Sequence, residues 1–193
     1  QGGASSQFAM VPMNLLRGGR KADYILTGNW AEKAYKEAKL VGGDNVRVGG
    51  TTKDLKFARL PKPGELTIGK DSAFVHFTSN NTVEGTQWQQ FPETGGIPYI
   101  CDMSSDIMWR PFDVKPFGLI YAGAQKNLGP VGITVVIVRR DLLERAGQPR
   151  ADIFNYASHL KGESMLNTPP TWNWNIDRKS TRLNSSHSDR TRM

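Results

Sequence analysis

The sequence of 193 residues contains a single cysteine and has no long apolar run. One cysteine, Cys101, excludes an internal disulfide framework and favours a reducing, cytoplasmic setting. Because apolar residues and Asp102 flank it, Cys101 is predicted to be a buried, inert thiol. No segment approaches the ~18 apolar residues that a membrane-spanning helix needs, and no secretory signal pattern is visible. The sequence therefore predicts a cytoplasmic protein with no membrane partner.

Residues that bind metals are also sparse. The three histidines, His76, His159 and His187, lie far apart, and no Cys/His spacing typical of a zinc site occurs. His76 lies within an apolar run and is predicted to be a core residue. We therefore predict no metal site.

The formal net charge of +7 is distributed unevenly. Residues 178–193 carry five basic residues and one acid, so the other 177 residues carry only about +3 and form no basic stripe. A non-enzymatic basic binding protein is therefore an alternative, but we expect no nucleic-acid partner. Residues 178–193 are predicted to be a disordered or foreign tail, because they have few apolar residues and no period. The abrupt start in a glycine-rich turn predicts an internal fragment of a longer protein.

Apolar runs of strand length dominate the central part of the chain. Because these runs are nearly continuous rather than alternating, they predict strands buried on both faces, in a mostly parallel α/β sheet between helices. Helices are expected over residues 7–16, 29–43 and 141–147, whereas residues 148–172 look polar and irregular. The predicted strands are 22–28, 45–50, 72–80, 97–105, 117–125 and 133–140.

Polar residues cluster immediately after four of these predicted strands. Parallel sheets bind ligands beyond the carboxyl ends of their strands, where such clusters meet at one edge. The sequence therefore predicts a ligand site at that edge. The clusters are residues 27–30, 78–82, 102–105 and 125–127.

Lys126 stands between two predicted buried strands, among glycines. A lysine in such a place suits imine formation with a carbonyl, and the cofactor that most often uses one is pyridoxal phosphate. Because this chemistry needs a neutral amine, we expect burial and a cationic neighbour to disfavour the protonated form of Lys126. Asp102, 24 residues earlier, could hold the protonated ring nitrogen of that cofactor. The alternative for Asp102 is a helix cap or Asx turn, helped by Ser104 and Ser105.

Five other residues suit the remaining parts of this cofactor. The backbone amides of Ala4 and Ser5, at the start of a helix, could hold its phosphate, and Gln125 could reach the same group. Trp30 could stack on the pyridine ring, although it could equally anchor its helix to the sheet. Thr82 could donate a hydrogen bond to the phenolic oxygen of the cofactor.

Six segments in order resemble the phosphoserine aminotransferase family, a class V group of pyridoxal phosphate enzymes. They are "QGGASSQFAMVPMNLL", "DYILTGNW", "SNNTVEGTQW", "CDMSSDI", "AGAQKNLGPVGITVVIVRRDLL" and "NTPPTW". The resemblance covers residues 1 to about 172. It implies a homodimeric transferase of fold type I that converts 3-phosphohydroxypyruvate and glutamate to phosphoserine and 2-oxoglutarate. The reaction belongs to serine biosynthesis and, in many bacteria, to pyridoxine biosynthesis.

The resemblance also implies residue roles and domains. Lys126 matches the imine-forming, proton-carrying lysine, and Asn167 and Thr168 match residues that reach the cofactor phosphate in the partner subunit. Residues 1–150 correspond to the cofactor-binding large domain without its N-terminal part, and residues 151–177 to a connection and the start of a truncated small domain. The other matched positions are Asp102 at the ring nitrogen, Trp30 stacking, Thr82, and the phosphate cradle of Ala4, Ser5 and Gln125.

Another fold type I pyridoxal phosphate enzyme is a second alternative. A cysteine desulfurase, for example, needs a mobile reactive cysteine, whereas Cys101 lies within a predicted strand. A different aminotransferase stays open at this point.

Overall fold

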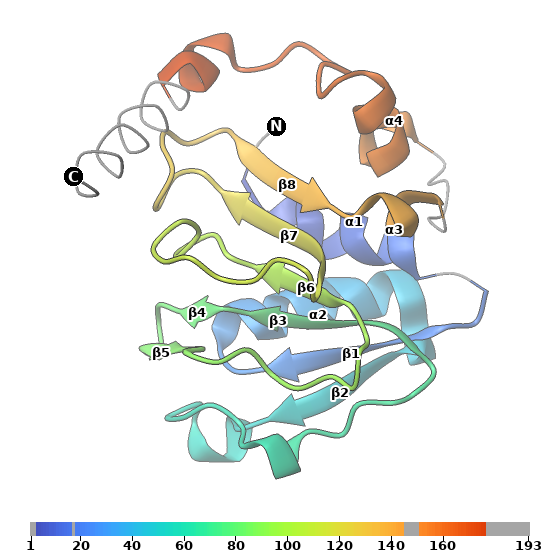
Figure 1. Ribbon diagram of the computed structural model, residues 1–193, viewed down its shortest axis with the longest axis vertical. Helices are drawn as coiled ribbons and strands as arrows, with labels where there is room; N and C mark the ends of the chain where they lie inside the picture. Colours follow the sequence, from blue (N-terminus) through green and yellow to red (C-terminus); the bar gives the residue numbers. More distant parts are fainter. Residues whose placement is uncertain (1–2, 17, 145–150, 177–193) are drawn as a thin grey trace.

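The computed structural model describes residues 3–16, 18–144 and 151–176. The predicted tail, residues 178–193, lies outside the described residues. Figure 1 shows a twisted sheet with helices packed along it and long loops on the opposite side.

The main sheet has six strands in the order β2-β1-β3-β6-β7-β8. All neighbouring pairs are parallel except β7 and β8, which are antiparallel. The expected mostly parallel α/β sheet is therefore confirmed, with β8 as an antiparallel edge strand. A separate small hairpin joins β4 (Asn80–Asn81) to β5 (Thr86–Gln87). The main strands are β1 (Lys21–Leu26), β2 (Val46–Thr51), β3 (Ser72–Thr78), β6 (Tyr99–Asp102), β7 (Phe117–Gly123) and β8 (Thr134–Val138).

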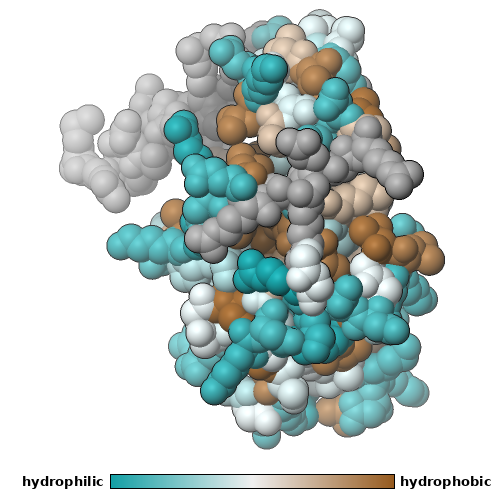
Figure 2. Space-filling view, turned by 90° about the vertical axis from the view of Figure 1, so that its right-hand side faces the viewer, coloured by the Kyte–Doolittle hydropathy of each residue, from teal (hydrophilic) through white to brown (hydrophobic). Residues whose placement is uncertain are grey.

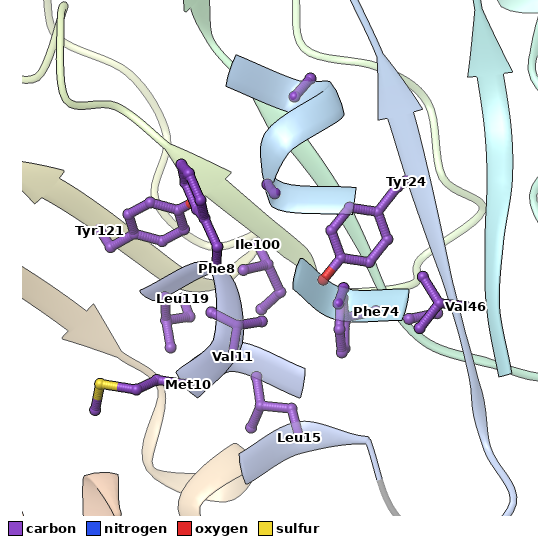
Figure 3. Packing of buried hydrophobic residues seen from close by; sticks show 14 of the residues in the cluster. Phe8, Met10, Val11, Leu15, Tyr24, Val46, Phe74, Ile100, Leu119 and Tyr121 are labelled. Carbon is purple, nitrogen blue, oxygen red and sulfur yellow. The ribbon is translucent and has the colours of Figure 1, made fainter. Parts of the chain in front are cut away.

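Two helices cover one face of the sheet. In α1 (Ser5–Leu15), the side chains of Phe8, Val11 and Leu15 pack toward the strands (Figure 3). The buried face of α2 (Asn29–Gly42) consists of alanines, which let the helix approach the sheet closely. Short 3₁₀ turns occupy Gly43–Asn45, Lys53–Leu55, Pro63–Glu65 and Asp152–Phe154.

The strands bury side chains on both faces, as their continuous apolarity predicts. Every residue of β3 and β7 is buried. Tyr24, Phe74 and Ile100 face the helices, whereas Val75 and Cys101 face a second cluster that loop residues such as Phe91 and Phe112 complete. The core predictions for Cys101 and His76 are confirmed, because the two residues are 0% and 1% exposed.

The C-terminal part holds more structure than its polar composition predicts. The short helices α3 (Arg140–Glu144) and α4 (Tyr156–Lys161) are present, and residues 171–176 are also helical. The expectation of an irregular segment over 148–172 is therefore wrong at α4. The reason is a tertiary contact: Tyr156 is buried against α1, where its hydroxyl donates to Gln7 Oε1 at 2.7 Å and its N–H to Asn14 Oδ1 at 3.0 Å.

The surface mixes hydrophilic and hydrophobic residues on the face drawn in Figure 2. Several large apolar side chains are exposed, among them Ile137 on the edge strand β8 and Trp172. Among the described residues, none of the helices has the length and apolarity needed to span a bilayer.

Candidate active site

A pocket lies at the carboxyl ends of the parallel strands, where the sequence predicts a site. β1, β3, β6 and β7 run in the same direction, so the polar residues that follow them meet at one edge of the sheet (Figure 1). The pocket opens on the side of α1 and α2. Its lining residues are Ala4, Ser5, Phe8, Trp30, Thr78, Asn80, Asp102, Ser104, Ser105 and Lys126.

Asp102 is the buried acid of this pocket. It ends β6 and is 6% exposed, and burial raises the pKa of its carboxyl above the ordinary value. The N–H and hydroxyl of Ser104 both donate to Oδ1, at 3.0 and 2.6 Å. These hydrogen bonds act to lower the pKa of Asp102, and the positive charge of Lys126 lowers it further but less strongly than the hydrogen bonds do. Asp102 therefore forms the Asx turn of the alternative interpretation and still lines the pocket.

Ser104 also connects two neighbouring strand ends. Its Oγ accepts a hydrogen bond from the N–H of Gly123 at 3.0 Å while its hydroxyl donates to Asp102. Gly123 is the last residue of β7, three positions before Lys126. Ser104 thus joins the acid to the strand end from which the turn that carries Lys126 begins.

Lys126 reaches the pocket from the turn after β7. The N–H groups of Leu128 and Gly129 donate to the carbonyl of Ala124 and hold this turn. Lys126 Nζ lies 3.5 Å from Thr82 Oγ1 and 5.4 Å from the centre of the Trp30 ring. The expectation that Lys126 is buried is wrong: its side chain is exposed, because the turn lies at the rim of the sheet.

The predicted phosphate and ring contacts lie on the other wall. Ala4 immediately precedes α1 and Ser5 is its first residue, where backbone N–H groups have no partner within the helix. Trp30 is the second residue of α2 and is half-buried. Within the described part of the chain, its buried Nε1 has no hydrogen-bond partner. The ring both packs on the hydrophobic core and lines the pocket.

Four predicted residues do not line this pocket. Thr82 contacts Lys126 but stands outside the lining, and the Gln125 side chain lies against Gly123. Asn167 lines a second pocket between α1, β8 and α4, and its neighbour Thr168 is exposed.

The structure adds lining residues to which we assigned no cofactor contact. Thr78 pairs in register with Asp102, and its hydroxyl is buried without a partner in the described residues. The available sequence signal was its position in the polar cluster of residues 78–82, close to the end of a predicted strand. Phe8, Asn80 and Ser105 join it from α1 and from the segments that follow β3 and β6.

The donor set suits a planar ligand that carries a carbonyl, a basic ring nitrogen and a phosphate. An amine, a carboxylate and an indole face surround the pocket, and the unpartnered Thr78 hydroxyl and Trp30 Nε1–H supply free hydrogen-bonding groups. No group of three His, Cys, Asp or Glu side chains that could hold a metal ion occurs in the described ranges. The residues present therefore fit pyridoxal phosphate.

A lysine and a buried carboxylate at the carboxyl edge of a mostly parallel sheet define the class of fold type I transferases. Within it, the chain belongs to the class-V aminotransferase family, whose family model matches residues 1–175. The phosphoserine aminotransferase of Lysinibacillus sphaericus is 52% identical over 172 residues, which are 89% of this chain and 47% of the relative. The chain spans about half the length of the curated relatives it matches.

Solved structures agree with this assignment. The phosphoserine aminotransferase of Bacillus circulans subsp. alkalophilus is 50% identical with a TM-score of 0.85, covering 92% of this chain and 48% of that one. The pyridoxal phosphate-bound phosphoserine aminotransferase of Trichomonas vaginalis is 36% identical with a TM-score of 0.87, covering 96% and 55%.

Proposed function

We propose that this chain is the cofactor-binding part of a phosphoserine aminotransferase. The proposed reaction is the transamination of 3-phosphohydroxypyruvate with glutamate, in serine biosynthesis. The observation that carries the proposal is that Lys126 and Asp102 line one pocket together with Trp30. The similarity to phosphoserine aminotransferases over nine-tenths of the chain supports the substrate class.

Five residues would hold the cofactor in this pocket. Lys126 would bind the aldehyde carbon, Asp102 the ring nitrogen, and the amides at Ala4 and Ser5 the phosphate. Trp30 would cover the ring. Pyridoxal phosphate supplies an electron sink that stabilises negative charge on the substrate Cα.

The protein side chains do the rest of the chemistry. Lys126 Nζ would accept the proton from the substrate Cα, which requires its amine to be neutral at that step. The Asp102 carboxylate would stay ionised beside a cationic ring nitrogen, since the opposite charge would offset the cost of its burial. The hydrogen bonds from Ser104 fix the carboxylate orientation.

The remaining assignments also belong to the proposal. We propose that the protein is a cytoplasmic homodimer and that it also takes part in pyridoxine biosynthesis. Asn167, Thr168 and Gln125 would contact the cofactor phosphate. The position of Asn167 in a pocket separate from Lys126 suits a role toward a second subunit. Residues 1–150 would form the large domain, and 151–177 the connection to a small domain.

Replacing Lys126 by alanine tests the central assignment. Addition of pyridoxal phosphate to the purified protein should produce a visible absorbance band that the Lys126→Ala variant lacks. Lys33→Ala is the matched control, because Lys33 Nζ also lies over the Trp30 ring, at 4.4 Å, but does not line the pocket. A variant without Lys126 that keeps the band would exclude the proposal.

A further inference from the structure

The amino end of α2 lacks a capping side chain of its own. Its N-cap residue is Gly28, which has no side chain that could accept hydrogen bonds from the first turn. Instead, Glu84 Oε1 accepts a hydrogen bond from the N–H of Asn29 at 2.8 Å. Glu84 lies 55 residues away in sequence, between β4 and β5. A carboxylate at this end of a helix is also favoured by the helix dipole.

Gly28 leaves room for this contact. A Cβ atom at position 28 would lie 2.3 Å from Glu84 Oε2 and 3.0 Å from Asn81 Oδ1. The backbone of Gly28 is extended, with φ of 167°, so other residues could adopt its conformation. Glycine is therefore needed here for space. Glu84 Oε2 is itself buried and has no partner among the described residues.

The base of the β4–β5 hairpin is held independently of Glu84. The buried Asn81 Nδ2 donates to Thr27 Oγ1 at 3.0 Å, and Gln87 Nε2 donates to Asp106 Oδ2 at 3.0 Å. Glu84 thus fixes the tip of the hairpin rather than its base. That tip carries Thr82, two residues before Glu84.

The two elements that Glu84 joins both contact the lysine. Thr82 Oγ1 lies 3.5 Å from Lys126 Nζ, and the Trp30 ring, one residue after the capped Asn29, lies 5.4 Å from the same atom. We propose that Glu84 is a positioning residue: it clamps the hairpin tip to the start of α2 and so holds Thr82 and Trp30 around Lys126. The inference rests on the proposed function, because it takes these residues as the cofactor site.

Two substitutions of Glu84 separate the effect of its side-chain length from the effect of its charge. Glu84→Asp keeps the charge but is one methylene too short for Asn29 N–H, whereas Glu84→Gln keeps an oxygen in place. We expect Glu84→Asp to raise the Kd for pyridoxal phosphate about three- to tenfold, and Glu84→Gln about twofold or less. Glu37→Asp and Glu37→Gln are matched controls on the exposed side of α2 and should bind as the wild type does.

Gly28→Ala tests the same clamp from the other side, since its methyl group would displace Glu84 without straining the backbone. It should weaken cofactor binding as Glu84→Asp does, and it keeps the test decisive if one Glu84 variant fails to fold. Hydrogen exchange of the cofactor-free protein gives a second readout. In Gly28→Ala and in Glu84→Asp, the backbone amides of residues 29–31 and 82–85 should exchange faster than in the wild type.

The outcomes separate the clamp from the proposed function. Wild-type Kd values in both Glu84→Asp and Gly28→Ala would overturn the clamp, even if thermal stability fell. Failure of the wild type itself to take up pyridoxal phosphate would overturn the proposed function and, with it, the positioning role. Exchange rates would then still show whether Glu84 joins the two elements.

Discussion

At the scale of single residues, Asp102 has an environment suited to a cationic ligand and poorly suited to an empty pocket. Burial raises the pKa of its carboxyl, so the folded protein binds a proton there at a higher pH than the unfolded chain does. Between the ordinary pKa of about 4 and the raised value, the free energy of unfolding therefore falls as the pH rises. Above that window the whole cost of the buried charge is present.

Asp102→Asn should consequently have opposite effects on stability and on cofactor binding. Without cofactor, the variant is expected to resist urea better than the wild type at neutral pH and to lose this advantage below about pH 4. Its affinity for pyridoxal phosphate should fall roughly tenfold or more, because a charge-assisted contact is lost. Urea titrations across the pH range and absorbance titrations measure the two effects. A variant less stable than the wild type at neutral pH would contradict this account.

At the scale of elements, a buried ion pair joins β1 to β2 at the end of the sheet away from the pocket. Asp23 and Arg47 are direct neighbours across the two strands, and the Asp23 side chain is 1% exposed. Arg47 Nε and Nη2 donate to its two oxygens at 2.9 and 3.0 Å, and Gly69 N–H donates at 2.8 Å. The Ser72 hydroxyl donates to the same carboxylate. These contacts compensate the negative charge of the buried Asp23 carboxylate within the sheet.

Arg47→Ala should destabilise the protein by about 3–5 kcal/mol, because it leaves a buried carboxylate without its partner. Arg47→Lys should restore only part of the loss, since an ammonium cannot form the two-point contact. Arg59→Ala is the control: its pair with Glu65 is exposed, and little change is expected. Urea unfolding of the three variants measures the difference. Equal stability of Arg47→Ala and Arg59→Ala would refute the structural importance of the pair.

At the scale of the whole molecule, most of the net positive charge belongs to one short stretch of the sequence. Residues 178–193 contribute a net +4 of the total +7. We expect their deletion to abolish any nucleic-acid binding at moderate salt, because such binding depends on the number of basic residues that contact phosphates. Cofactor absorbance and the unfolding transition should be unchanged. Fluorescence anisotropy with a labelled oligonucleotide measures the nucleic-acid binding. Binding that persists in the truncated protein would support the alternative of a basic binding protein.

Much of the candidate site follows from local patterns. Continuous apolar runs mark strands buried on both faces, and polar residues directly after them share an edge once those strands are parallel. This places Asp102 and Lys126 together, as the structure shows. The same reasoning misses α4, whose helix depends on contacts of Tyr156 with α1. It also misjudges the burial of Lys126, which depends on how the rim turns pack.

The sequence by itself determined the six main strands, the first three helices, their order and the pair of Asp102 and Lys126, because strand length, apolarity and polar ends are local properties of the chain. Only the tertiary structure decided the contacts between distant segments: Glu84 with the N–H of Asn29, Thr78 beside Asp102, and the Gln125 side chain against Gly123. The reason is physical. Hydrogen-bonding groups and close contacts far apart in sequence are selected by the packing of whole elements, which no local period encodes.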